Sequence, residues 1–60
     1  MTSEQLRQWR RDMGWTQEEA ARQLGRGVRS YEYLESGAST IKRETALACE
    51  ALRRKENRLP

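Results

Sequence analysis

The nucleophiles, general bases and metal ligands on which most enzymes depend are scarce in this chain of 60 residues. It has no histidine, which is the commonest general base and the commonest metal ligand, and its one cysteine is Cys49. One cysteine without a histidine forms neither a thiol–imidazole pair nor a zinc site, and it allows no intrachain disulfide. We therefore expect no catalytic residue, no metal, no cofactor and no enzymatic activity.

Arginine and lysine carry the remaining chemistry, and they are distributed unevenly along the chain. The formal net charge is +3 and the isoelectric point is about 9.6. One basic block occupies residues 22–43 and another occupies residues 53–58. The first block contains Arg22, Arg26, Arg29, Lys42 and Arg43 against Glu32 and Glu35. A small basic domain suits nucleic acid, an acidic protein or a membrane surface, so the elements that position these cations have to distinguish the partners.

The composition is that of a folded but very small domain. Hydrophobic residues make up 35% of the chain and charged residues another 35%, with both signs of charge present. A single core of this size is marginally stable, so we expect a second subunit. No apolar stretch approaches the roughly 20 residues of a membrane helix, and residues 1–8 are too polar for a signal peptide. With its lone cysteine, the chain is expected to be cytoplasmic and to have no membrane partner.

Helical periodicity and capping residues predict four helices and no strand. In the first helix, Thr2 and Gln5 have the spacing of a capping box, while Leu6 and Trp9 recur on one face. Gly14 supplies the left-handed residue that commonly follows a helix. We therefore expect the first helix to end just before Gly14.

Two shorter helices follow, with a tight turn between them. Thr16 and Glu19 have capping-box spacing at the start of a helix over about 17–24, whose buried stripe is Ala20, Ala21 and Leu24. After Gly25 and two further residues, a third helix is expected over about 28–35. Its inward residues are Tyr31 and Leu34. Its outward face consists of Val28, Arg29, Glu32, Tyr33 and Ser36.

A fourth helix is expected after a cap at Ser39 or Thr40. Its core stripe consists of Thr45, Ala48, Cys49 and Leu52. Leu47 and Ala51 lie on an adjacent face of the same helix. The polar end of the chain is expected to fray, which gives a domain over residues 1–56 and a tail over residues 57–60.

The segment from Thr16 to Gly37 combines these features into one pattern. Two short helices joined by a tight glycine-containing turn form a helix-turn-helix unit. The segment TQEEAARQLGRGVRSYEYLESG resembles the Cro/C1-type (XRE) helix-turn-helix repressors in its Thr-Gln start, its two acidic residues, its Leu-Gly pair, and Glu35 and Gly37. The resemblance covers about residues 4–53. It implies an all-α fold, a compact four-helix, lambda-repressor-like domain, with five helices as the alternative.

Three positions depart from the pattern of that family. Ala20 stands where leucine is usual, Tyr31 where isoleucine or valine is usual, and Gly27 where a serine or threonine cap is common. A small residue facing an enlarged one can preserve the volume of the core. The tandem alanines, the arginine and tyrosine four apart on the third helix, and the segment ALACEAL are also similar to small anti-CRISPR-associated regulators of phages and mobile elements.

The resemblance implies that the third helix enters the major groove of double-stranded DNA. The base-reading residues are then Val28, Arg29 and Tyr33, with Glu32 as a further candidate. The guanidinium of Arg29 fits O6 and N7 of guanine, and Val28 can contact a thymine methyl group. Phosphate contacts are assigned to Gln17, Arg26, Ser36, Thr40, Lys42 and Arg43. Arg29, Lys42 and Arg43 can instead be ordinary solvated surface charges. Tyr33 can be a surface aromatic that caps the core, and these alternatives stay open.

The family register also places Arg10 opposite Glu35, where we expect a structural ion pair between the first and third helices. Leu47, Ala51 and Leu59 lack an obvious partner within the chain, so we assign them to a homodimer interface. The implied function is a transcriptional repressor, autoregulatory and of phage or mobile-element type, that occupies an inverted-repeat operator in the bacterial cytoplasm without a small-molecule effector. The alternative is an antitoxin-type protein-interaction module that also binds DNA.

Overall fold

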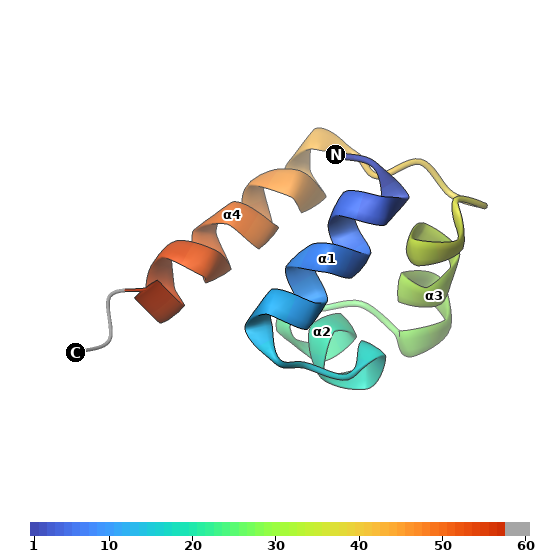
Figure 1. Ribbon diagram of the computed structural model, residues 1–60. Coiled ribbons are helices and arrows are strands. Elements are labelled where there is room, and N and C mark those ends of the chain that lie inside the picture. The colour runs from blue at the N-terminus through green and yellow to red at the C-terminus, as the bar shows by residue number, and fades with distance from the viewer. Residues whose placement is uncertain (58–60) are drawn as a thin grey trace.

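The computed structural model describes the backbone of residues 1–57 and the side chains of residues 1–55, and within this range helices are its only regular secondary structure. The helices are α1 (Ser3–Met13), α2 (Gln17–Gln23), α3 (Val28–Ser36) and α4 (Arg43–Asn57). Figure 1 shows α1 in the middle of the fold, with α2 and α3 on one side and α4 on the other. The predicted all-α, four-helix architecture is confirmed. Leu59, assigned to the dimer interface, lies outside the described residues.

Both ends of α1 are set by the residues that flank it. The hydroxyl of Thr2 accepts a hydrogen bond from the N–H of Gln5 at 3.1 Å, and the Gln5 side chain accepts one from the N–H of Thr2 at 2.8 Å. At the other end, Gly14 has a φ of 75° and its N–H donates to the carbonyl of Arg11. This left-handed residue turns the chain toward α2, as the sequence predicts.

The start of α2 has one of the two hydrogen bonds predicted for it. The Thr16 hydroxyl accepts from the N–H of Glu19 at 3.1 Å. The Glu19 carboxylate, expected to return to the Thr16 backbone, instead accepts from the side chains of Arg22 and Gln23. These donors lie one turn further along the same helix face, so they compete with the cap for the carboxylate. The capping box predicted here is therefore incomplete.

The start of α4 also differs from the prediction. Neither Ser39 nor Thr40 caps this helix, which begins at Arg43 with its first backbone hydrogen bonds to the carbonyl of Lys42. The N–H of Ser39 donates back to a carbonyl of α3 at 3.2 Å, and Ile41 packs against the core. These two anchors hold the connection in an irregular conformation, so the helix begins later than the predicted caps would place it.

The core lies where α1, α2 and α3 meet, with one residue from α4. Tyr31 is the largest fully buried side chain, and it shares the buried cluster with Ala20, which is also fully buried. The other buried apolar residues are Leu6, Trp9, Ala21, Leu34 and Cys49. Burial raises the pKa of the Cys49 thiol to about 11, so this group stays protonated at neutral pH and packs as a small apolar residue.

Trp9 connects α1 to its neighbours on two sides. Its indole N–H donates to the carbonyl of Cys49 in α4 at 3.0 Å. Its ring meets the ring of Trp15 edge to face, with 5.6 Å between the ring centroids. The buried tryptophan therefore both satisfies its own donor and fixes the turn between α1 and α2.

α4 is the helix least enclosed by the others. Figure 1 shows that it diverges from α1 toward its C-terminal end, and the fold measures 37 × 20 × 18 Å along its principal axes. Thr45 and Cys49 are buried as predicted, whereas Ala48 and Leu52 are half-buried. On the outward face, Leu47 is 51% exposed. Among the described helices, none has the length and apolar character needed to cross a membrane.

Candidate nucleic-acid interface

α3 has two faces of opposite character. Its inward side chains, Tyr31, Leu34 and Glu35, are buried. The residues predicted for the outward face are all exposed, and they are Val28, Arg29, Glu32, Tyr33 and Ser36. Val28 and Tyr33 keep 43% and 49% of their surface exposed, although one is aliphatic and the other aromatic. A face with an aliphatic, an aromatic, a cationic and a carboxylate side chain can contact several kinds of base edge.

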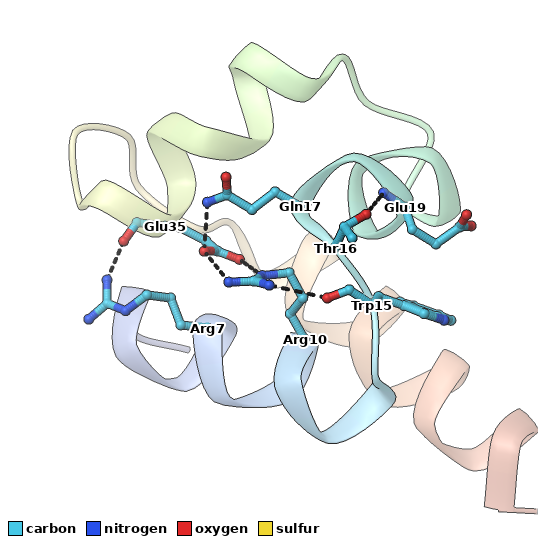
Figure 2. A network of polar contacts seen from close by, with 7 residues as sticks. All are labelled: Arg7, Arg10, Trp15, Thr16, Gln17, Glu19 and Glu35. Carbon is cyan, nitrogen blue, oxygen red and sulfur yellow. Dashed lines mark hydrogen bonds and ion pairs between the residues drawn. The ribbon is translucent and has the colours of Figure 1, made fainter.

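Glu35 is the residue at which α1, α2 and α3 are tied together, as Figure 2 shows. Its carboxylate accepts from Arg10 Nε at 2.7 Å and from Arg10 Nη2 at 3.4 Å. It also accepts from Gln17 Nε2 at 3.0 Å. The Glu35 side chain is 4% exposed and that of Arg10 is 20% exposed, so this ion pair is largely buried.

Two further contacts extend this network. Arg10 Nη1 donates to the carbonyl of Trp15 at 3.1 Å, and Arg7 Nη1 donates to the backbone carbonyl of Glu35. Arg7 lies one helical turn before Arg10, so both guanidinium groups extend from the same face of α1. Sequence reasoning missed Arg7, although its spacing of three residues from Arg10 is the signal that could have found it. Together these contacts fix which face of α3 points outward.

The pKa values in this network favour the ionised pair. Burial raises the pKa of the Glu35 carboxyl, but hydrogen bonds, led by the one from Arg10, outweigh it and hold the pKa below its ordinary value. The hydrogen bond to Glu35 raises the pKa of Arg10 in turn. The pKa of the Tyr31 hydroxyl is raised by burial first and by its interaction with Glu35 second. This hydroxyl is buried and has no hydrogen-bond partner among the described residues.

Gln17, which the sequence predicts as a phosphate contact, is placed by the structure against Glu35. It is the first residue of α2, and one hydrogen of its side-chain amide is used in the bond to the Glu35 carboxylate. An amide nitrogen carries two hydrogens, so one donor remains for an external acceptor. Gln17 therefore has a structural contact in the free chain, which the sequence did not predict.

Arg26, another predicted phosphate contact, is placed between α3 and α4. It lies in the turn after α2, where its Nη1 donates to Ser30 Oγ at 3.0 Å and its Nη2 donates to Thr45 Oγ1 at 3.1 Å. The side chain of Arg26 is half-buried and that of Thr45 is buried. Thr45 is 19 residues further along the chain, so no local sequence pattern could have predicted this bridge.

Ion pairs neutralise several of the cations that the sequence placed in two basic blocks. Arg22 pairs with Glu18 and Glu19, Arg53 pairs with Asp12, and Arg54 pairs with Glu50. Among the side chains of residues 1–55, five cations are exposed and form no ion pair, namely Arg11, Arg29, Lys42, Arg43 and Lys55. Three of these five cations lie on α3 or at the start of α4, whereas Arg11 lies on α1 and Lys55 lies toward the end of α4.

Lys42 and Arg43 lie beside the N-terminus of α4. Arg43 is the first residue of that helix and Lys42 precedes it. Cations near a helix N-terminus are unfavourable because they oppose the positive end of the helix dipole. Glu44, in the first turn of α4, offsets part of this effect. A bound phosphate would offset the rest.

The two hydroxyl residues assigned to phosphate are Ser36, the last residue of α3, and Thr40, in the connection before α4. The Ser36 hydroxyl donates to the carbonyl of Tyr33 at 3.0 Å and accepts from the N–H of Ala38 at 3.3 Å, so it closes the end of α3. Thr40 is exposed. Both side chains are exposed, in the stretch of chain that runs from the end of α3 to Lys42 and Arg43.

Comparison with known protein families gives a match over nearly the whole chain. A family model described as a helix-turn-helix domain matches residues 3–59. No curated protein and no solved structure matches the chain. The matched range contains α1 to α4, so the exposed face of α3, Lys42 and Arg43 lie within the matched domain.

Proposed function

Because the chain belongs to the family of helix-turn-helix domains, we propose that it is a sequence-specific DNA-binding regulator of transcription that inserts α3 into the major groove. The observation that carries this proposal is the exposed outward face of α3, which includes Arg29, a cation that forms no ion pair within residues 1–55. The buried pair of Arg10 and Glu35 supports it by holding that face outward.

Four side chains on this face are proposed to read bases. Arg29 is exposed and makes no ion pair with the described side chains, so its guanidinium can donate in a bidentate manner to O6 and N7 of guanine. Val28 at the start of α3 can rest on a thymine methyl group, and Glu32 can accept from N4 of cytosine. Tyr33 can pack on a base edge or donate to a phosphate.

The phosphate backbone is proposed to be held on either side of α3. Lys42 and Arg43 provide the charge, and Thr40 and Ser36 provide hydroxyl groups next to them. Gln17 can use its second amide hydrogen at the start of α2. Contacts of this kind position the protein on the duplex and give no sequence preference by themselves.

The chain is proposed to act as a homodimeric repressor on an inverted-repeat operator. A single α3 reads few base pairs, and a two-fold dimer doubles the site in the symmetry of an inverted repeat. The outward face of α4, which carries Leu47 and Ala51, is the proposed dimer surface because it is exposed and apolar at these positions. A repressor of this size acts by occupying the promoter, which includes its own promoter in the autoregulatory case.

Selection of bound duplexes from a random-sequence pool tests this function. We expect an inverted repeat to be enriched, and the enriched duplex to bind roughly 10³-fold more tightly than a scrambled duplex of the same composition at the same salt concentration. A footprint on the DNA upstream of its own coding sequence then tests autoregulation. Equal affinity for the enriched and the scrambled duplex would reject sequence-specific recognition and leave a general cationic surface.

A further inference from the structure

Arg26 forms a hydrogen-bonded bridge between α3 and α4. Its guanidinium lies in the turn between α2 and α3, donates through Nη1 to Ser30 in α3, and donates through Nη2 to Thr45 in α4. Both acceptors are hydroxyl groups, so the two hydrogen bonds orient the guanidinium group without neutralising its charge. Thr45 is 7% exposed, which means that this end of the bridge is held inside the fold rather than at its surface.

The bridge is notable because α4 has few other ties to the helix-turn-helix unit. Within residues 1–55, three side-chain hydrogen bonds join α4 to the rest of the chain. Two of them involve α1, through Trp9 and Asp12, and the third comes from Arg26. The angle between α3 and α4 is therefore constrained directly, at the level of polar side chains, by Arg26.

We propose that Arg26 is a positioning residue that sets the preferred spacing between the two half-sites of the operator, by fixing α3 relative to α4. This inference rests on the proposed function, in which α3 reads DNA and α4 forms the dimer. In such a dimer, the separation and rotation of the two α3 helices follow from the angle between α3 and α4 in each subunit. One base pair of spacing moves a half-site by about 3.4 Å along the duplex and by about one-tenth of a turn around it.

The alternative role for Arg26 is the phosphate contact that its charge suggests, and two substitutions separate the roles. Thr45→Val removes the buried acceptor with little change of volume and leaves every cation in place. Arg26→Lys keeps the charge, but an ammonium group lacks the planar fork that reaches two hydroxyl groups at once. Arg22→Lys serves as the control, because Arg22 is exposed on α2 and paired with Glu18 and Glu19.

The experiment measures the affinity of each variant for an isolated half-site and for inverted repeats whose spacer is shortened or lengthened by one or two base pairs. We expect Thr45→Val, which alters no assigned DNA contact, to bind the half-site as the unmodified chain does. On the repeat with the best spacing, Thr45→Val and Arg26→Lys should both bind roughly tenfold more weakly, and their preference among spacings should flatten or move. Arg22→Lys should keep both the affinity and the preference.

Several outcomes would overturn the inference. If Thr45→Val and Arg26→Lys both keep the spacing preference of the unmodified chain, the bridge does not set the spacing. If Arg26→Ala weakens the half-site and all repeats equally and flattens the salt dependence, Arg26 is a phosphate contact. If the unmodified chain prefers no DNA sequence, the proposed function fails and this inference fails with it, a result distinct from the first two. Should Thr45→Val not fold by circular dichroism, Arg26→Lys decides the question alone.

Discussion

A carboxylate that is almost fully buried has to be neutralised where it lies, and Glu35 depends on Arg10 for this. Arg10→Ala leaves the charge of Glu35 with the neutral donor Gln17. We expect this substitution to lower the free energy of unfolding by about 3 kcal/mol, the lower end of the range for buried pairs, because Arg10 is partly exposed. Urea denaturation measures the effect, with Arg11→Ala on the exposed side of α1 as the control. Equal midpoints for the two variants would contradict the prediction.

The same carboxylate makes stability depend on pH. The pKa of Glu35 in the folded chain lies below its ordinary value of 4.5, which applies to the unfolded chain. A lowered pKa contributes stability that is fully present above the unfolded pKa and is lost as the pH falls through the folded pKa. We expect the unmodified chain to lose stability as the pH falls below about 4.5, and Glu35→Gln to lose less over that interval. Denaturation curves at a series of acidic pH values measure this, and parallel losses would contradict it.

Arg29 and Arg43 are both exposed, but they are expected to act differently on DNA. Arg29→Ala should weaken operator binding by about 1–3 kcal/mol and relax the preference at one base pair of each half-site. Arg43→Ala should weaken binding to all sequences alike and reduce the slope of affinity against salt by about one unit per lost phosphate contact. Titrations on operator and scrambled duplexes at several salt concentrations distinguish the two. If Arg29→Ala weakens both duplexes equally, Arg29 is a phosphate contact and base reading rests on its neighbours in α3.

At the level of elements, α3 begins without a side-chain cap. Gly27 occupies the N-cap position with a φ of −70°, and a Cβ atom built on it would meet nothing within 4 Å. Serine fits this backbone and adds a hydroxyl acceptor for the first N–H groups of α3, while it also reduces the freedom of the unfolded chain. We expect Gly27→Ser to raise the free energy of unfolding by about 0.5–1 kcal/mol.

Gly25, two residues earlier in the same turn, provides the matched control. It also has open space around it, but its φ is 70°, a conformation that residues with a side chain rarely adopt. Gly25→Ser should therefore lower the free energy of unfolding by about 1–2 kcal/mol. Thermal denaturation of the two variants should shift in opposite directions, and a shift in the same direction would show that the turn has a different backbone conformation from the one described.

The features that could be predicted from the sequence are those decided within one or two turns of the chain. The cap at Thr2, the left-handed Gly14 and the burial of Tyr31 all follow from local spacing, and the structure confirms them. The predicted cap on α4 was wrong because Ile41 packs against the core and Ser39 donates to a carbonyl of α3. Neither contact is visible in the local sequence pattern.

The candidate site was predictable to a different degree. The exposed face of α3 follows from helical periodicity alone. The hydrogen bond from Gln17 to Glu35 spans 18 positions of the sequence, and the one from Arg26 to Thr45 spans 19 positions. Both contacts therefore depend on how the helices pack. The sequence therefore assigned both side chains to DNA and could not show that each also has a hydrogen-bond partner within the fold.

For the molecule as a whole, the prediction concerns assembly. A homodimer through the outward face of α4 would place the two α3 helices roughly 34 Å apart, one turn of DNA. Leu47 is the large apolar side chain exposed on this face, so Leu47→Glu should convert the dimer to a monomer and weaken operator binding. Arg11→Gln, which changes the net charge by the same amount on α1, is the control. Sedimentation that finds a monomer both free and on DNA would rule out this assembly.

The edge-to-face contact between Trp9 and Trp15 makes this chain optically informative without any label. The chain has two tryptophans, and both lie within this contact, so its ultraviolet emission reports on the junction of α1 and α2. When the chain unfolds, the Trp9 indole leaves the Cys49 carbonyl and enters water, and its emission should move to longer wavelength. A variant that has lost only operator binding should keep the emission spectrum of the folded chain, so a fluorescence spectrum distinguishes it from a variant that has lost its fold.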